Sequence, residues 1–239
     1  MDGTWRQAWS IVGREFKIDR YYILASLILI AYMGFFSGIM IGEIPQKSGL
    51  LLVVDLIFWA IASMIGYYFS KRIAKYMMED SYTSMLAYYR TLPISPQALV
   101  LARMIQLLLC TLFNGTLFFI IVYFVHHGVH EQMGLAAYLV FAFTWTAFGL
   151  IFNCLYIGME LLMRGKGYFW YNCALVLVME AIVVGLHYTV GSIVESSIRI
   201  SVDRGVASPA LWILLLLAAA SIFAAYRVIV SRLPLRNLG

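Results

Sequence analysis

Six apolar stretches, each about 20 residues or longer, constrain this 239-residue chain more than any other feature. A helix of about 20 apolar residues is long enough to cross the roughly 30 Å hydrocarbon core of a bilayer. Charged residues make up only 12% of the chain, against about 25% in a soluble domain. The sequence therefore predicts an all-α integral membrane protein and excludes a soluble enzyme or nucleic-acid-binding domain. The six predicted spans are Tyr21–Gly42, Leu50–Ser70, Val100–Val125, Gly134–Gly158, Tyr168–Tyr188 and Ala210–Val230.

Basic residues are distributed unevenly over the segments around these spans. Of the 17 lysines and arginines, only Lys47, Arg199 and Arg204 fall on one side of the membrane. The others fall at the two termini, between the second and third spans, between the fourth and fifth spans, or just inside a span next to these segments. Because cytoplasmic loops carry the excess of basic residues, we predict that both termini are cytoplasmic.

The first 20 residues precede the six-helix transmembrane domain predicted for residues 21–239. Trp5, Trp9, Val12 and Phe16 recur at helical spacing, and basic and polar residues lie between them. An amphipathic helix of this composition is typical of one lying in the membrane interface. We expect an interfacial helix in residues 1–20, which could be a plain membrane anchor.

The longest connection joins the second and third spans, at residues 71–98. A short helix is predicted over Ser81–Arg90, after the acidic residues Glu79 and Asp80. Ser95 and Pro96 then have the residue types of an N-cap and first helical position, so they are expected to begin the third span. The short helix is expected to expose apolar and aromatic side chains, which would be unfavourable unless a partner docked on them. These side chains are Tyr82, Met85, Leu86 and Tyr89.

Two features inside the spans favour packing or transport roles. Gly34, Gly38 and Gly42 lie four residues apart and form a smooth stripe for close approach of another helix. That helix could belong to a second subunit or to the same chain. Glu180 lies near the middle of the fifth span, where it could be a neutral hydrogen-bonded residue or part of a substrate path.

The other polar residues suggest structural roles. Asp55 is expected to reach water near the outer surface, and Asn114, Asn153 and Asn172 are expected to bond between helices. The histidines at 126, 127 and 130 favour a solvated turn over a metal site. Two structures are compatible with the segment between the last two spans, Thr189–Ser208: a short outer helix pair or a solvated loop. No pattern indicates a catalytic, metal or cofactor site.

Architecture and one local motif together resemble the six-helix ABC exporter permeases of the ABC-2-type, type V class. The motif runs from an acidic pair through a short helix to a Leu-Pro-Ile-Ser break, followed by a basic residue in the next span. Ser81-Tyr82-Thr83 stands where the family usually has a glycine after the acidic pair. The matching residues are Glu79, Asp80, Leu92, Pro93, Ile94, Ser95 and Arg103.

The resemblance implies a non-catalytic transport subunit in a cell membrane, expected to be the bacterial cytoplasmic membrane. Its partners would be a second permease and separate cytosolic ATPase subunits, which bind ATP and Mg²⁺. The chain contains no G-x-x-x-x-G-K-[ST] phosphate-binding loop of its own. The implied cargo is an amphipathic peptide, drug or lipid-like molecule. The implied coupling residues are Glu79, Asp80, Ser81, Tyr82, Met85, Leu86, Tyr89 and Arg90.

An alternative remains compatible with the residues themselves. The chain could be a channel or scaffold that is not driven by ATP and docks another partner through residues 71–98. Association with an ATPase subunit would distinguish the two functions.

Overall fold

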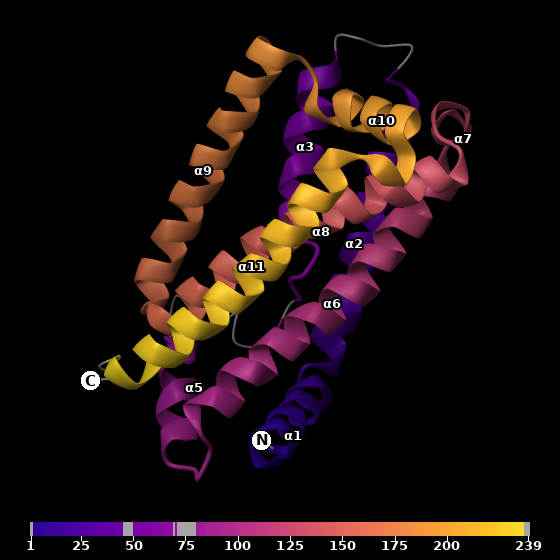
Figure 1. Cartoon of the computed structure of the whole chain (residues 1–239). Coiled ribbons are helices and arrows are strands. Elements are labelled where there is room, and N and C mark those ends of the chain that lie inside the picture. The colour runs from indigo at the N-terminus through magenta and orange to yellow at the C-terminus, as the bar shows by residue number, and fades with distance from the viewer. Residues whose placement is uncertain (1, 45–49, 69, 71–79, 237–239) are drawn as a thin grey trace.

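The structure is a computed structural model that describes residues 2–44, 50–68, 70 and 80–236, without the side chains of Asp2, Ser81 and Tyr82. All the regular secondary structure in that part of the chain is helical, as the sequence predicts (Figure 1). The helices are α1 (Asp2–Ile18), α2 (Arg20–Gly42), α3 (Leu51–Met64), α5 (Ser81–Arg90), α6 (Pro96–Val125), α7 (His127–Gln132), α8 (Leu135–Leu162), α9 (Gly165–Val190), α10 (Ile193–Arg204) and α11 (Pro209–Arg232). Two single 3₁₀ turns, η2 (Gly205–Ala207) and η3 (Leu233–Leu235), flank α11.

Among the described helices, α2, α6, α8, α9 and α11 are long and apolar enough to cross a bilayer. They indicate a multi-pass membrane protein. The second predicted span differs, because α3 ends at Met64 after 14 residues. At 1.5 Å per residue it covers about 21 Å, which is shorter than the hydrocarbon core. The prediction of one continuous helix over Leu50–Ser70 is therefore wrong.

The first helix is amphipathic, as predicted, but it packs through a different face. Ala8, Ile11, Val12 and Glu15 are buried, whereas the Trp5 and Trp9 side chains are about half exposed. The buried face packs against α6. The exposed tryptophans remain available to a membrane interface, and their rings meet edge to face with centroids 6.0 Å apart.

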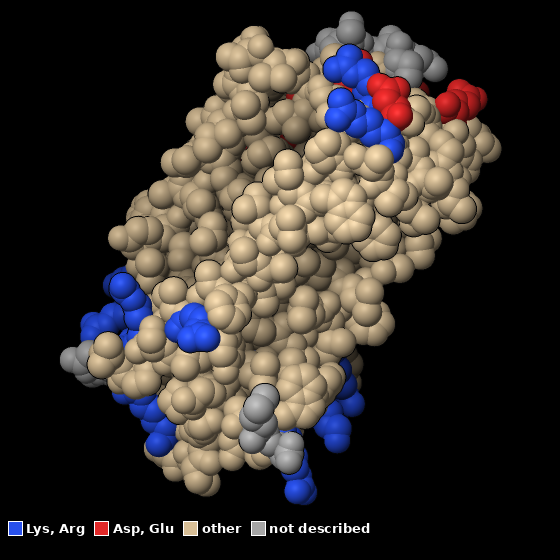
Figure 2. All heavy atoms as spheres, viewed as in Figure 1, with Lys and Arg blue, Asp and Glu red and all other residues tan. Residues whose placement is uncertain are grey.

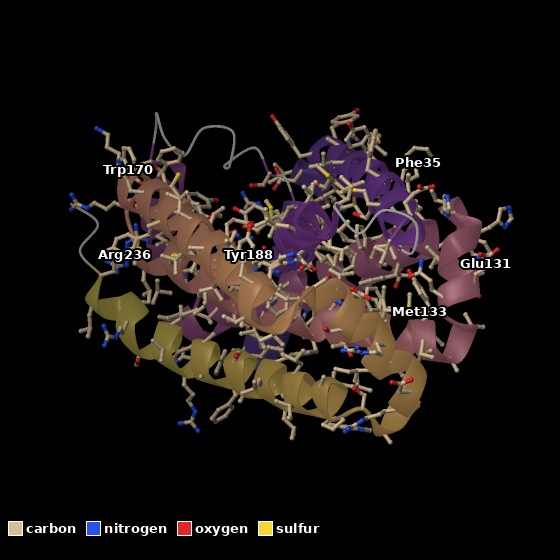
Figure 3. All side chains as sticks on the ribbon, turned by 90° about the horizontal axis from the view of Figure 1, so that it is seen from above. Phe35, Glu131, Met133, Trp170, Tyr188 and Arg236 are labelled. Carbon is tan, nitrogen blue, oxygen red and sulfur yellow. The ribbon has the colours of Figure 1, made fainter. Side chains whose placement is uncertain are left out.

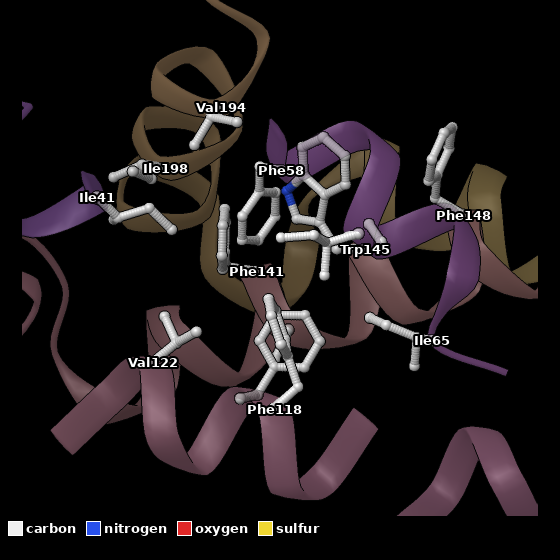
Figure 4. Close-up of a cluster of buried hydrophobic side chains, with 14 of the residues drawn as sticks. Ile41, Phe58, Ile65, Phe118, Val122, Phe141, Trp145, Phe148, Val194 and Ile198 are labelled. Carbon is white, nitrogen blue, oxygen red and sulfur yellow. The ribbon is translucent and has the colours of Figure 1, made fainter. Parts of the chain in front are cut away.

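Two clusters of buried side chains hold the helices together. The cluster nearer α10 is rich in aromatic residues from α3, α6 and α8, with Phe58 at its centre (Figure 4). The Phe58 ring contacts the rings of Phe118, Phe141 and Trp145 at centroid distances of 4.8 to 5.8 Å. The second cluster joins α1, α5, α6, α8 and the end of α11 at the opposite end of the molecule.

The glycine stripe of α2 packs inside the chain. A Cβ added at Gly34 or Gly38 would lie 3.1 to 3.3 Å from atoms of α6, and one at Gly42 would overlap the His126 ring. All three glycines are buried. Of the two alternatives, the structure shows the one in which the stripe packs against a helix of the same chain, α6.

On the face shown in Figure 2, charged side chains gather toward the two ends of the elongated molecule, and the surface between them is largely uncharged. The two termini lie toward the end that holds α1 and α5, and α7 and α10 lie at the other (Figure 1). We call these the α5 end and the α10 end. Arg199 and Arg204 belong to α10, so they lie apart from the described basic residues of the α5 end. The predicted sets also include Lys47, Lys71, Arg72 and Lys75, which lie outside the described residues.

Candidate functional site

The short helix α5 has the predicted bounds, Ser81–Arg90, but the opposite exposure at three positions. Met85, Leu86 and Tyr89 were expected on its surface and are instead buried, with 7% or less of each side chain exposed. They lie in the second apolar cluster together with α1 and α6. The reason is that α1 folds back over α5, which local sequence spacing does not reveal. Among the described side chains of α5, the exposed ones are those of Ser84, Ala87, Tyr88 and Arg90.

The remaining residues of the implied coupling set are placed only in part. Glu79 lies outside the described residues, and for Ser81 and Tyr82 only the backbone is described. Asp80 precedes the helix in a left-handed conformation with φ 41°. Arg90 points to the C-terminal segment, where its guanidinium donates to the carbonyl oxygens of Leu233 (3.0 Å) and Arg236 (2.8 Å).

The C-terminal segment also donates a hydrogen bond to α5. The Arg236 guanidinium donates to Thr83 Oγ1 at 2.6 Å and to the carbonyl oxygens of Leu161 and Met163 at the end of α8. Partial burial lowers the pKa of Arg236 from its ordinary value. On the other side of α5, Arg14 of α1 donates to the Tyr88 hydroxyl at 3.3 Å, which raises the pKa of Arg14. The helix is therefore fixed at both sides.

A buried charged cluster lies directly beneath α5. Glu15 of α1, Arg103 of α6 and Glu160 of α8 have side chains that are at most 10% exposed. Arg103 forms an ion pair with Glu160, and its Nη1 lies 3.7 Å from Glu15 Oε2. Gln106 accepts from Arg103 (2.7 Å) and donates to Glu15 (2.7 Å). The Tyr89 hydroxyl donates to Glu15 Oε1 at 2.9 Å, so α5 belongs to the same network.

Next to this cluster the second span loses its helical form. Two asparagines from neighbouring helices bond the backbone there, as expected of residues that join helices. Asn114 of α6 donates to the carbonyl oxygens of Ile65 (3.0 Å) and Tyr67 (2.9 Å). Asn153 of α8 donates to Ser63 (2.9 Å). Non-helical backbone at membrane depth requires such protein partners, because lipid supplies none.

Small residues let the helices close around this break. A Cβ at Gly66 would lie 2.6 Å from side-chain atoms of both Leu107 and Thr111. A Cβ at Gly149 of α8 would overlap the carbonyl oxygen of Ala62 in α3. Close packing here therefore depends on glycine at these two positions.

The broken span and the charged cluster are connected. Arg103 Nη1 lies 3.5 Å from the hydroxyl of Tyr68, which follows the break. A cavity of about 30 Å³ lies between them, lined by Gly66, Tyr68, Arg103, Asn153 and Glu160 among others. A continuous set of polar contacts thus runs from Tyr89 of α5 through Glu15 and Arg103 to the broken span.

At the α10 end, Asp55 holds an outer helix. The prediction that Asp55 reaches water is wrong, because the residue is only 1% exposed. Its carboxylate accepts from Ser192 Oγ and the backbone N–H groups of Ile193 and Val194, at 2.9 to 3.1 Å. His187 Nδ1 lies 2.8 Å from the same carboxylate. Asp55 therefore binds the N-terminus of α10. The segment between the last two spans is thus a helix, which the sequence did not distinguish from a solvated loop.

The histidine-rich segment forms α7, and His126 caps the N-terminus of that helix. His126 Nδ1 accepts from the N–H of Gly128 at 3.0 Å, at the start of that six-residue helix. Within the described residues, no three His, Cys, Asp or Glu side chains are grouped as a metal site would require.

Glu180 lies on α9, the least buried spanning helix together with α11. The helix stands apart from α11 in Figure 1, and Figure 3 shows Trp170 at the outer edge of the molecule. Glu180 is partly buried, and its Oε2 is buried without a hydrogen-bond partner among the described residues. The described structure therefore provides no hydrogen bond for Oε2.

Sequence reasoning missed the charged cluster and the break. The sequence places Arg103 among the cytoplasmic charges, whereas the structure buries it between α1, α6 and α8. One signal was present: Glu15 follows Ala8, Ile11 and Val12 at helical spacing, which places it on an apolar face. The break gave no comparable signal, because Ile65-Gly66-Tyr67-Tyr68 is as apolar as a helix interior.

Comparison with known proteins identifies no family. No family model matches the chain, and no curated protein or solved structure matches it either.

Proposed function

We propose that this chain is the transmembrane permease subunit of an ATP-driven ABC exporter. It would form a translocation path with a second copy or a second permease, in the bacterial cytoplasmic membrane. Separate ATPase subunits would bind ATP and Mg²⁺ and dock on α5. The observation that supports this proposal is the series of contacts from Tyr89 through Glu15 and Arg103 to the broken second span.

This series gives α5 a mechanical connection to the membrane helices. A force on the exposed face of α5 would act on Glu15 through the Tyr89 hydroxyl, and on α6 and α8 through Arg103. Buried ion pairs have strict geometry, so displacement of one partner is communicated to the others. The break after Met64 supplies a place where α3 can bend, since the α-helix ends there and the next backbone bonds, such as Tyr67 N–H to the Met64 carbonyl oxygen, span three residues.

The proposed cycle is alternating access. Closure of the ATPase subunits would push α5, and the rigid start of α6 at Ser95 and Pro96 would carry that movement into the membrane. Ser95 Oγ accepts from the N–H of Ala98 at 3.2 Å, so α6 begins with the expected cap. The cargo would be an amphipathic peptide, drug or lipid-like molecule.

Co-purification tests the proposal. The tagged chain, extracted from native membranes in mild detergent, should carry with it a subunit that has a phosphate-binding loop. The complex should hydrolyse ATP, whereas the chain alone should not exceed background. Isolation of an intact chain with no ATPase, or with only an unrelated partner, would contradict the proposal and favour the channel or scaffold.

A further inference from the structure

A cavity of about 430 Å³ lies between α2, α3, α8 and α9. Its volume falls within the range of about 300–1,000 Å³ that is typical of sites for drug-sized ligands. All four helices are apolar, so the surroundings of the cavity are lipid and protein. None of the described residues that line it is charged. Its lining includes Ser26, Leu29, Met33, Tyr168 and Val176, together with residues of α3 between positions 60 and 64.

The polar groups of this cavity gather at its α5 end. Tyr168 and Asn172 lie in the first turns of α9, and the hydroxyls of Tyr67 and Tyr168 are 2.7 Å apart. Tyr156 lies beside them, with its ring centroid 6.3 Å from that of Tyr67. The Asn172 side chain donates to the carbonyl oxygen of Tyr168 at 2.8 Å. This end therefore presents hydroxyl and amide groups.

The other end of the cavity is apolar. Along α9 the lining changes from Tyr168 and Asn172 to Val176, which lies four residues, or about 6 Å, further into the membrane. Along α2 it runs from Ser26 near the α5 end to Met33, a rise of about 10 Å. The cavity is thus polar toward the α5 end and apolar toward the middle of the membrane. A lipid in the adjacent leaflet has the same order of polar and apolar parts.

We propose that this cavity binds a single-chain amphiphile from the leaflet at the α5 end. The acyl chain would lie against Leu29, Met33 and Val176, and an ester, amide or hydroxyl of the head region would bond the tyrosine and asparagine groups. The volume accommodates one drug-sized molecule and is small for a two-chain lipid. The role of this amphiphile as cargo rests on the proposed export function, whereas its binding does not.

Photocrosslinking tests the binding step without ATP or a partner. The purified chain is reconstituted in vesicles of equal parts phosphatidylcholine and phosphatidylglycerol, with a lysophosphatidylcholine probe that carries a diazirine in its acyl chain. Labelling should map to residues 26–33, 60–64 and 172–176. Labels scattered evenly over the lipid-facing surfaces of α2, α6, α9 and α11 would overturn the proposal.

A matched pair of variants on α9 sharpens the test. Val176→Trp fills the cavity and should reduce labelling there by about tenfold, because the added ring occupies the site of the acyl chain. Val178→Trp introduces the same ring at an exposed position outside the cavity and should leave labelling unchanged. Met33→Trp fills the cavity from α2 and should repeat the loss if Val176→Trp fails to fold. Equal labelling of the cavity-filling and control variants would contradict the site.

The outcomes separate the site from the proposed function. Labelling at the cavity without any ATPase partner would support the site and contradict the export function. Normal capture of the ATPase with scattered labelling would support export and overturn this binding site.

Discussion

Arg103 joins three helices at the α5 end. Its guanidinium contacts Glu160 of α8, Glu15 of α1 and Gln106 of its own helix. Removing one partner from a buried ion pair is strongly destabilising, because the remaining charge stays buried without compensation. The local helices are therefore held together by electrostatic contacts as well as by the apolar cluster around them.

Substitution of this arginine should destabilise the folded protein. Arg103→Met leaves two carboxylates buried and should lower the free energy of unfolding by about 3–5 kcal/mol. Thermal unfolding in detergent, followed by size-exclusion chromatography, measures the loss. Arg199→Met removes an exposed arginine of α10 and should have little effect. Unfolding temperatures that fall equally in both variants would show that the cluster contributes no special stability.

At the scale of the helix, sequence patterns were informative where local chemistry decides the structure. Ser95 with Pro96 began α6, because capping and proline geometry act over a few residues. Ser81–Arg90 became α5 with the predicted bounds, although Asp80 makes no side-chain cap hydrogen bond there. The buried side of α5 was not predictable, since it depends on α1 packing against it from 70 residues away. The end of α3 at Met64 was not predictable either, because Asn114 and Asn153 stabilise it from other helices.

The corrected exposure of α5 changes which residues can test docking. Tyr89 bonds Glu15 from a buried position, so Tyr89→Ala would damage the fold as well as any interface. Tyr88 is 48% exposed and lies on the outer face. Aromatic side chains are frequent anchors of protein interfaces, where truncation typically costs more than about 1–2 kcal/mol.

Tyr88→Ala should therefore weaken capture of the ATPase subunit by roughly tenfold or more while the chain remains folded. Pull-down of the ATPase at several concentrations measures this loss. Tyr188→Ala truncates a tyrosine that is 76% exposed, at the α10 end of α9, and should leave capture intact. Identical capture by both variants would remove the outer face of α5 from the proposed interface.

For the whole molecule, the two ends differ in their charge and in their structure. The α5 end carries the exposed basic side chains of α1 and the C-terminal segment, whereas Arg199 and Arg204 lie in α10 at the other end (Figure 2). Because basic residues are retained on the cytoplasmic side, the α5 end is predicted to face the cytoplasm. The proposed coupling depends on this orientation, since ATPase subunits reach only that side.

Cysteine labelling with a membrane-impermeant maleimide tests the orientation. The three native cysteines are first replaced by alanine, because Cys173 is only partly buried. Asp203→Cys is exposed in α10 and should react in intact cells, whereas Ser84→Cys is exposed in α5 and should react only after the membrane is opened. Both sites are on the surface, so a difference in reaction reports the side of the membrane rather than burial. Labelling of Ser84→Cys from outside would invert the topology, and α5 could then not receive a cytosolic ATPase.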